Sequence, residues 1–504
     1  MTNNCRKPLF VSLCDLCGLN ITAPEPNPFG ASKNAKDREG DVLYEVSNRI
    51  VRTSLLERSY GSVAVILAVW VLSVNHLGAQ TMPQQDPRMA MLTNQQSVSG
   101  GIGVTVIDGK PYYLFNIMPD LSFGKWGIGL DVNLRVGQDG KIRQGDFKDG
   151  YSYLRLLRYI RYGQKNENVY ARVGALDFAR IGHGSIIYLY RNTASYDLRK
   201  VGVEFDLDFQ KGGLESMYSD VAGAGVLGLR GYVRPLQFGQ GASIPILGNL
   251  EVGATFASDF NSNANRTWGD PAGTIRNAEG GGVLSIVGLD VGLPLLSHEY
   301  IGSTLYADYA KILSYGSGTA VGLNLRLRGL GLVTLDAKYE RRFVGNQYLP
   351  TYFDAFYEHD RYQVIDTSRF MSKAQILKST QSFEGYFGEV LVSILGTLNI
   401  VGGYQAPVGV KNAGTLHLML DVGDALPGIL VSGGYDKKNV GSIFKLDNNS
   451  LLYAQVGYKP APYLVVSMLY QWTYTEIRDE QSGQVVGFKP QKRIEPRVGF
   501  IARF

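Results

Sequence analysis

Residues 493–504 read Arg-Ile-Glu-Pro-Arg-Val-Gly-Phe-Ile-Ala-Arg-Phe. Two sets of side chains alternate along this stretch. One set is apolar or small and the other is charged: Ile494, Val498, Phe500, Ala502 and Phe504 against Arg493, Glu495, Arg497 and Arg503. Because successive side chains of a strand point to opposite faces, the stretch predicts a strand with one face toward hydrocarbon and the other toward water.

A closing strand with an aromatic Phe500 and a terminal Phe504 resembles the C-terminal strand of bacterial outer-membrane β-barrels. The resemblance implies a porin-like barrel of no specific subfamily, in which this strand pairs with the first strand and closes the wall. It also implies that Phe500 and Phe504 belong to the signal read by the outer-membrane assembly machinery.

The same alternation recurs along most of the chain. Its clearest case is residues 126–136, where Trp126, Ile128 and Leu130 alternate with glycine and charged residues. We predict an all-β, transmembrane, antiparallel up-and-down barrel of about 16 strands, with a range of roughly 14–18. The predicted strands are 126–136, 153–162, 169–178, 201–210, 226–234, 250–256, 283–293, 301–312, 321–327, 333–343, 383–392, 398–404, 416–422, 429–435, 452–458, 464–474 and 493–504. A secreted β-sandwich is the alternative with the same period.

The N-terminal region predicts export. Arg49, Arg52 and Arg58 precede the apolar run 63–74, and a small residue, Ala79, follows. This is the layout of a signal peptide cleaved near Ala79, because the run is shorter than the roughly 17–25 residues of a spanning helix. We therefore divide the chain into 1–79 (an extension, from a mis-assigned start, plus the signal peptide), a polar lead-in at 80–99 and a barrel at 100–504.

Composition excludes several classes of function. The chain has 50 Lys plus Arg against 45 Asp plus Glu, a balance that does not favour nucleic-acid binding. All three cysteines, Cys5, Cys14 and Cys17, precede the predicted cleavage site, so the mature chain is predicted to have no disulfide. The 61 glycines and 31 tyrosines fit crowded barrel walls and aromatic girdles. No cofactor and no metal site is predicted.

Function is expected on the inner face of the barrel, where charged side chains tune what passes. A transverse field across an aqueous pore and mutual pairing of opposite charges are two open interpretations of these residues. The candidate lumen-lining residues are Asp131, Arg135, Glu204, Asp206, Asp208, Arg326, Arg328, Asp336, Lys338, Glu340, Arg342 and Arg497.

Long connections are predicted to be extracellular and short ones periplasmic. The long ones are 259–280, 345–382 and 478–492, and the short ones include 329–331 and 459–462. The aromatic segment 345–382 is the candidate constriction loop. It either folds inward or packs outside as a cap, and the sequence does not choose between these.

Three motifs carry weaker alternatives. Residues 223–228 have dinucleotide-loop spacing without a following helix, and 259–270 has calcium-like oxygen spacing with Ala264 where glycine is expected. His183 and Ser185 suggest a barrel hydrolase, with Asp177 or Asp197 to orient the base.

The interpretation that fits most of these features is a non-enzymatic, porin-like channel for small solutes in the outer membrane of a Gram-negative bacterium. Its expected partners are outer-membrane lipid, the assembly machinery and small solutes. The alternatives are a non-conducting structural or surface-binding barrel and an outer-membrane hydrolase. The sequence leaves the solute and the oligomeric state open.

Overall fold

The structure is a computed structural model. It describes residues 97–503 except 108, 145, 148–149, 166, 194–199, 263–266, 270–274, 278–281, 329–331, 367–368, 423–424, 448 and 479–484. The described residues belong to one compact unit, His76–Phe504. The predicted extension and signal peptide lie outside them, so these remain predictions.

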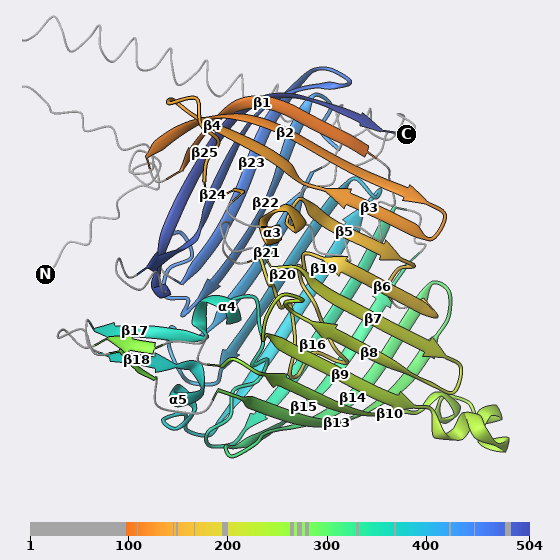
Figure 1. The fold of residues 1–504 in the computed structure, drawn as a ribbon. Helices are drawn as coiled ribbons and strands as arrows, with labels where there is room; N and C mark the ends of the chain where they lie inside the picture. Colours follow the sequence, from red (N-terminus) through yellow and green to blue (C-terminus); the bar gives the residue numbers. More distant parts are fainter. Residues whose placement is uncertain are drawn as a thin grey trace, which may run out of the picture. The chain divides into compact units, whose positions relative to one another are not determined.

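A single antiparallel sheet forms the wall of the molecule (Figure 1). Its strands follow one another along the chain. β3 and β4 both pair with β2 and make one interrupted strand, so the barrel has 20 strands. The first ten are β1 (Ser97–Ile107), β2 (Lys110–Phe123), β3 (Trp126–Leu130) with β4 (Val132–Gly137), β5 (Leu157–Tyr162), β6 (Val169–Gly174), β7 (Gly202–Phe209), β8 (Gly212–Tyr218), β9 (Val226–Val233), β10 (Glu251–Asp259) and β13 (Leu284–Ser297). The others are β14 (Ile301–Ile312), β15 (Ser317–Leu327), β16 (Val333–Val344), β19 (Phe383–Ile394), β20 (Leu398–Pro407), β21 (Thr415–Asp421), β22 (Ile429–Lys438), β23 (Ser450–Ala461), β24 (Leu464–Arg478) and β25 (Val485–Arg503).

The barrel closes between its first and last strands. β1 pairs with β2 along one edge and with β25 along the other, where Gly100 lies opposite Phe500 and Ser97 opposite Arg503. Closure removes the unpaired edge that an open sheet would present. The prediction of a closed antiparallel barrel is confirmed. Phe504 lies outside the described residues.

The predicted number of about 16 strands is wrong, because the prediction lacks β1, β2 and β8. β1 is rich in glycine and shows weak alternation. At the closing seam, a Cβ on Gly103 would lie 2.2 Å from the carbonyl oxygen of Pro496, so the tight approach to β25 requires glycine there. β2 contains consecutive apolar residues and two prolines, which hide its period, and β8 is short and polar.

The wall carries apolar side chains on its outside. Large side chains in the middle of strands are 46–61% exposed, among them Ile102, Phe115, Leu289, Val321 and Val456. Their sequence neighbours face inward and are buried, as Leu114 and Asp290 are at 1% and 7% exposure. This alternation explains why these sequences form strands of a closed sheet.

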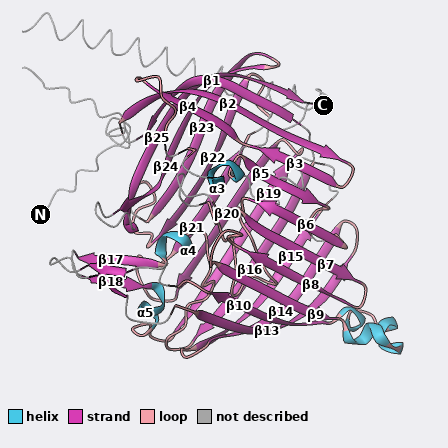
Figure 2. Cartoon of the chain, in the orientation of Figure 1, coloured by secondary structure: helices cyan, strands magenta, loops and turns pink. Residues whose placement is uncertain are grey.

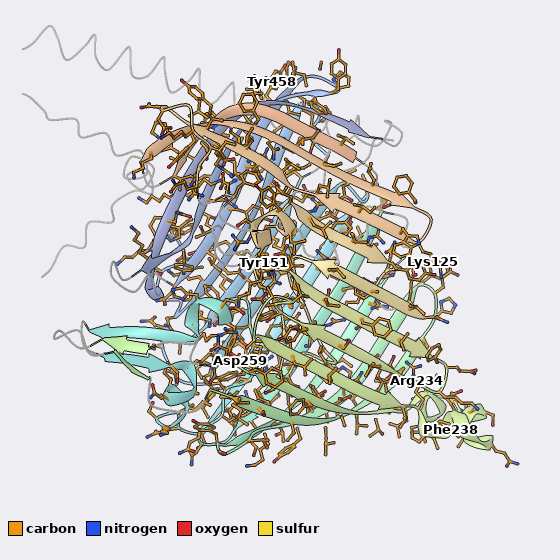
Figure 3. All side chains as sticks on the ribbon, in the orientation of Figure 1. Lys125, Tyr151, Arg234, Phe238, Asp259 and Tyr458 are labelled. Carbon is orange, nitrogen blue, oxygen red and sulfur yellow. The ribbon has the colours of Figure 1, made fainter. Side chains whose placement is uncertain are left out.

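The two ends of the barrel differ in their connections. At one end, residues 124–125, 210–211 and 462–463 form short turns. Residues 234–250 are the exception, with three single-turn 3₁₀ helices, η2 (Pro235–Phe238), η3 (Gln240–Ser243) and η4 (Leu247–Asn249). Lys125, Arg234 and Phe238 mark this end in Figure 3.

Longer segments lie at the other end, and each helix among the described residues belongs to a connection between strands (Figure 2). These longer segments contain three helices, α3 (Gly150–Leu154), α4 (Tyr357–Asp360) and α5 (Lys373–Leu377). They also contain two small hairpins, β11 (Thr267–Gly269) with β12 (Ile275–Asn277) and β17 (Tyr362–Asp366) with β18 (Arg369–Ser372). The prediction of a loop at 478–492 is wrong for most of its length, because β25 begins at Val485. Which end faces the periplasm stays a prediction.

The regular pairing of strands in the wall is interrupted beside β4. Within the described part of the chain, β4 pairs with β2 alone. The segment that contains α3 covers its other side, through a bridge between Val136 and Ile142 and a 2.8 Å hydrogen bond from the Asp131 amide to the Leu156 carbonyl oxygen.

Candidate functional site

The predicted acidic strand, β7, is neutralised within the wall. Glu204 and Asp206 are 4% and 6% exposed, and the Lys165 ammonium lies 3.3 Å and 2.9 Å from their carboxylates. Asp208, near the end of β7, pairs instead with Arg234 at 2.8 Å. This stretch therefore fits the interpretation in which opposite charges pair, since each acid has a basic partner.

The predicted hairpin of β15 and β16 divides into two parts. Glu340 is fully buried and lies 2.8 Å from the Lys338 ammonium and 2.5 Å from the Arg342 guanidinium. Arg326 and Asp336, near the end of the hairpin with short turns, form an exposed pair at 3.2 Å. Arg328 approaches the same Asp336 at 3.9 Å, with its side chain 46% exposed.

The third group of predicted residues lies at the closing seam. Arg135 is fully buried, 3.3 Å from Asp146 and 3.7 Å from Glu495 of β25. Glu495 also pairs with Arg493 and Arg497 and accepts a 2.7 Å hydrogen bond from Thr105 of β1. Asp131 is buried on the same interrupted strand. The candidates thus fall into separate clusters on three parts of the wall, and their role in lining a conducting path stays a prediction.

A segment between β6 and β7 runs through the interior. We call residues 175–193 inner loop 1. Leu176, Ile187 and Tyr190 have no exposed surface, and Ile181 and Ile186 are 4% exposed. The wall is shaped for this loop: a Cβ on Gly228 of β9 would lie 2.5 Å from both Ile181 and Ile187.

The predicted constriction loop also turns inward. We call residues 345–361, between β16 and β17, inner loop 2. Its aromatic side chains Tyr348, Tyr352, Phe353, Phe356 and Tyr357 are at most 4% exposed. The structure therefore settles the choice that the sequence left open for this part of 345–382, while β17 and β18 continue as a separate hairpin.

The two inner loops pair with each other. Ile187 and Phe353 form a parallel β-bridge. The Tyr188 amide donates to the Phe353 carbonyl oxygen at 3.1 Å, and the Phe353 amide donates to that of Ile186 at 3.1 Å. The Thr351 amide donates to the Ser185 carbonyl oxygen at 2.8 Å. We call the joined loops the plug.

The plug contacts two different arcs of the wall through apolar clusters. One cluster joins the loops to inward side chains of β8, β9, β10, β13, β14 and β16, such as Met217, Ile286 and Ile312. The other joins Phe178, Tyr188 and Phe356 to inward side chains of β19, β20, β21, β23 and β24, such as Leu391 and Tyr474. The two arcs adjoin at β16 and β19 and together extend from β8 to β24 of the closed sheet, so the plug lies across the lumen.

Polar side chains fix the plug to the wall at several points. The Tyr188 hydroxyl donates to Glu389 of β19 at 2.6 Å, and the Tyr357 hydroxyl donates to Asp259 of β10 at 2.6 Å. The Arg191 guanidinium lies 3.0 Å from Asp436 of β22. Asp259, labelled in Figure 3, is fully buried and belongs to the segment predicted as a calcium-like loop, so its carboxylate is already engaged.

Glu358 connects the two loops electrostatically. Its carboxylate accepts from the Tyr190 hydroxyl and pairs with Lys200 at 2.7 Å and Arg361 at 3.4 Å. Burial alone would raise the pKa of Glu358, but Arg361 and Lys200 outweigh it and hold that pKa at about 2. Glu358 is therefore ionised at neutral pH.

A pocket of about 270 Å³ lies between inner loop 2 and the wall. Arg342, Thr351, Lys373, Gln405 and Lys438 supply polar groups to it. The Lys373 ammonium donates to the Tyr352 carbonyl oxygen at 2.6 Å, and burial lowers the pKa of Lys373 to about 8. The pocket is small enough for a single small solute.

The hydrolase motif gains no support in its predicted form. Asp177 accepts a hydrogen bond from Thr193, and Asp197 lies outside the described residues. His183 lies 3.9 Å from Asp290, a carboxylate that the sequence analysis did not single out. Residues 223–228 lead into β9, as expected for a turn before a strand.

Inner loop 1 is the main feature that sequence reasoning missed. Residues 186–190, Ile-Ile-Tyr-Leu-Tyr, form a continuous apolar run without alternation. In a barrel whose strands alternate, such a run marks a segment buried on all sides. His183 was noticed, but only as a catalytic hint.

Comparisons with known proteins give matches among solved structures alone. No family model and no curated protein matches it. Among solved structures, the siderophore receptor PirA from Acinetobacter baumannii aligns with 10% identity over 81% of both chains, with a TM-score of 0.33. OccK11 (OpdR) from Pseudomonas aeruginosa aligns with 12% identity over 81% of this chain and 95% of that one, with a TM-score of 0.27. OccK5 (OpdH) from the same organism aligns with 12% identity over 81% of this chain and 98% of that one, with a TM-score of 0.28.

Bacterial outer-membrane β-barrels are the proteins this chain is similar to. TM-scores this low say nothing about function. None of the described helices is long and apolar enough to cross a membrane.

Proposed function

We propose that the chain is an outer-membrane channel for small solutes whose path is narrowed by the plug. The observation that carries the proposal is the pairing of inner loops 1 and 2 inside a closed 20-stranded wall. Barrels of about 16–18 strands already enclose an aqueous channel, and about 22 strands enclose a lumen that a plug fills. A wall of this size is too wide for its own side chains to fill.

The membrane location rests on the outer face. Exposed Ile102, Phe115, Leu289, Val321 and Val456 come from strands all around the barrel. In water, apolar surface of this extent would drive aggregation, whereas lipid solvates it. The aromatic Trp126 and Tyr458, 53% and 60% exposed near short turns, fit an interfacial girdle, and Tyr458 points away from the wall in Figure 3.

Export and assembly complete the proposal. Residues 1–79 carry the signal peptide and are removed near Ala79, and the lead-in and barrel form the mature chain. Phe500, which is 42% exposed on β25, and Phe504 are read by the assembly machinery. Outer-membrane lipid, this machinery and small solutes are the partners.

The plug favours selective passage over free diffusion. Its apolar clusters exclude water from part of the lumen, while the pocket beside Lys373 and Lys438 offers polar groups to a solute. We propose that this pocket is the place where a solute first contacts the plug. The buried pairs around Glu204, Glu340 and Glu495 set the charge of the wall along the remaining path.

The same apolar clusters favour one second candidate, a non-conducting barrel that displays its loops. In that case the plug is a permanent core, and the hairpins β11–β12 and β17–β18 would form the binding surface. The two candidates differ in whether any current or solute crosses the lumen.

The test is single-channel recording of the refolded protein in a planar bilayer, beside a variant in which residues 346–381 are replaced by a short Gly-Ser linker. A solute channel gives small or intermittent steps for the wild type and much larger steps for the variant. A silent wild type with a conducting variant supports the display barrel. If both folded proteins are silent, the lumen is not a conduit and the channel proposal fails.

A further inference from the structure

We propose that His183, Asp290 and Asp308 form a binding site for a divalent transition-metal ion that fastens inner loop 1 to the wall. One ligand atom from each residue lies within 4.8 Å of the other two. His183 comes from the loop, Asp290 from β13 and Asp308 from β14. The three come together only when the plug is inside the barrel.

The site holds two carboxylates, and the Arg230 guanidinium pairs with only one of them, Asp290. Asp290 and Asp308 are directly opposite each other in the β13–β14 register. They are 7% and 5% exposed, so water screens them poorly. Like charges opposite each other destabilise a sheet, and burial increases the cost. A cation between them removes this repulsion.

Buried atoms of Asp308 and His183 that lack ordinary hydrogen-bond partners also indicate a bound ion. Apart from the Ser185 hydroxyl beside it, the Asp308 carboxylate has no hydrogen-bond donor among the described residues, and His183 Nε2 is buried without a hydrogen-bond partner. No Lys or Arg nitrogen among the described residues lies within ion-pair distance of Asp308. Buried polar atoms are almost always satisfied, so a group of them facing one another indicates a ligand.

The imidazole is held in a position suited to coordination. Its ring stacks on Tyr306 of β14 at 4.1 Å with an interplanar angle of 9°. A Cβ on Gly292 would lie 3.2 Å from Nε2, so the glycine leaves room for the ring against β13. The neutral imidazole is the form that binds metals.

Arg230 of β9 is the competing cation, and its contacts are compatible with the site. It donates to Asp290 Oδ2 at 3.0 Å and Oδ1 at 2.6 Å. It also pairs with Glu215 at 2.7 Å and Glu251 at 2.8 Å, so it keeps two carboxylates if one Asp290 oxygen turns toward a metal. Arg230 does not neutralise Asp308.

The donor set decides the kind of ion. One imidazole nitrogen and two carboxylate oxygens suit Zn²⁺ and related first-row ions, at about 2.0–2.2 Å from the metal. Tetrahedral ligands at that radius are separated by about 3.4 Å, so the 3.9 Å between His183 Nε2 and Asp290 Oδ1 needs only a small contraction. The fourth ligand would be water or the hydroxyl of Ser185, a residue of inner loop 1 that lies beside Asp308.

The test is zinc binding to the untagged, refolded chain in which Cys5, Cys14 and Cys17 are replaced by serine, because thiolates also bind zinc. Binding is measured by isothermal titration calorimetry and by metal content after dialysis. We expect one Zn²⁺ per chain in this cysteine-free parent, with affinity reduced more than about 10-fold in His183→Gln and in Asp308→Asn. The matched control is His417→Gln, which removes another buried histidine beside a carboxylate, Asp436, and should leave zinc binding unchanged.

X-ray absorption of the zinc-loaded cysteine-free parent gives a readout that does not depend on a site variant folding. The site predicts a shell of nitrogen and oxygen ligands with one histidine. Absence of saturable zinc binding overturns the proposal and indicates that a shared proton satisfies these atoms. Binding that survives both substitutions, or a shell with several histidines, also overturns it. Conductance is recorded separately, because the metal site does not depend on whether the lumen conducts.

Discussion

The wall and the plug are stabilised by different interactions. The wall is a closed ladder of backbone hydrogen bonds, apart from the interrupted strand, where β4 pairs with β2 alone among the described residues. Its outer side chains are largely apolar and exposed. The plug has only a short bridge around Ile187 and Phe353 between its two loops, and otherwise depends on buried side chains and ion pairs. We therefore expect the plug to loosen while the wall stays folded, as the proposed channel would require of a gate.

The largest expected effect separates the two regions directly. Phe353 is fully buried between the loops, so Phe353→Ala should destabilise the plug by about 3–5 kcal/mol through lost packing and a cavity. Hydrogen exchange should accelerate in inner loops 1 and 2 and stay slow in the strands. Phe115→Ala on the outer face is the control and should leave plug protection unchanged. Equal acceleration in the wall strands would show that wall and plug form one cooperative unit.

A charge on the outer face should give the opposite pattern. Leu289, in the middle of β13, is 61% exposed, so Leu289→Arg should destabilise the wall by about 2–4 kcal/mol if that position meets the bilayer centre. Chemical denaturation in liposomes measures this, with Leu289→Ile as the control. An unchanged unfolding midpoint would argue against a lipid-facing surface at this position.

Acid should loosen the plug through Glu358. Its pKa in the folded chain, about 2, lies below the ordinary value of 4.5. Its contribution is therefore fully present above pH 4.5 and is lost as the pH falls toward 2. Glu358→Gln should cost about 1.5–3 kcal/mol at neutral pH and remove this part of the acid dependence. Conductance and plug hydrogen exchange measured between pH 5 and about 2.5 test it. An equal acid response in wild type and variant would mean that other carboxylates control the plug.

The smallest effect is expected at a predicted lumen residue. Arg326 and Asp336 form an exposed pair, so Arg326→Ala should change wall stability by about 0–1 kcal/mol and leave plug protection unchanged. Denaturation midpoints of the variant and wild type give the measurement. A larger loss would show that this pair is shielded from solvent in the membrane.

Sequence reasoning succeeded where one physical rule acts alone. The alternation at 126–136 and 464–474 reflects an apolar outer face and a more polar inner face of the wall, so those strands were predictable. It failed for β1, where close approach at the seam requires glycine, and for β8, which is short and polar. In β1 and β8, pairing with the neighbouring strands determines the strand conformation, and the alternation of apolar and polar residues does not.

The sequence predicted which individual residues face the interior, but not how the interior is packed. The sequence indicated that Glu204 and Arg135 face inward, yet their partners Lys165 and Asp146 depend on three-dimensional placement. The aromatic content of 345–382 marked one half of the plug. The other half, around Ile187, went unrecognised because a non-alternating apolar run has no meaning until a lumen exists to bury it.

The most direct test of the plug is a disulfide between its two loops. With Cys5, Cys14 and Cys17 replaced by serine, Ser185→Cys with Thr351→Cys introduces two thiols beside the 2.8 Å hydrogen bond that joins these residues. We predict spontaneous formation of one intramolecular disulfide and a conductance that stays low at acidic pH until the bond is reduced. Failure of the two cysteines to cross-link in the folded protein, or a fully open oxidised channel, would contradict a lumen spanned by two paired loops.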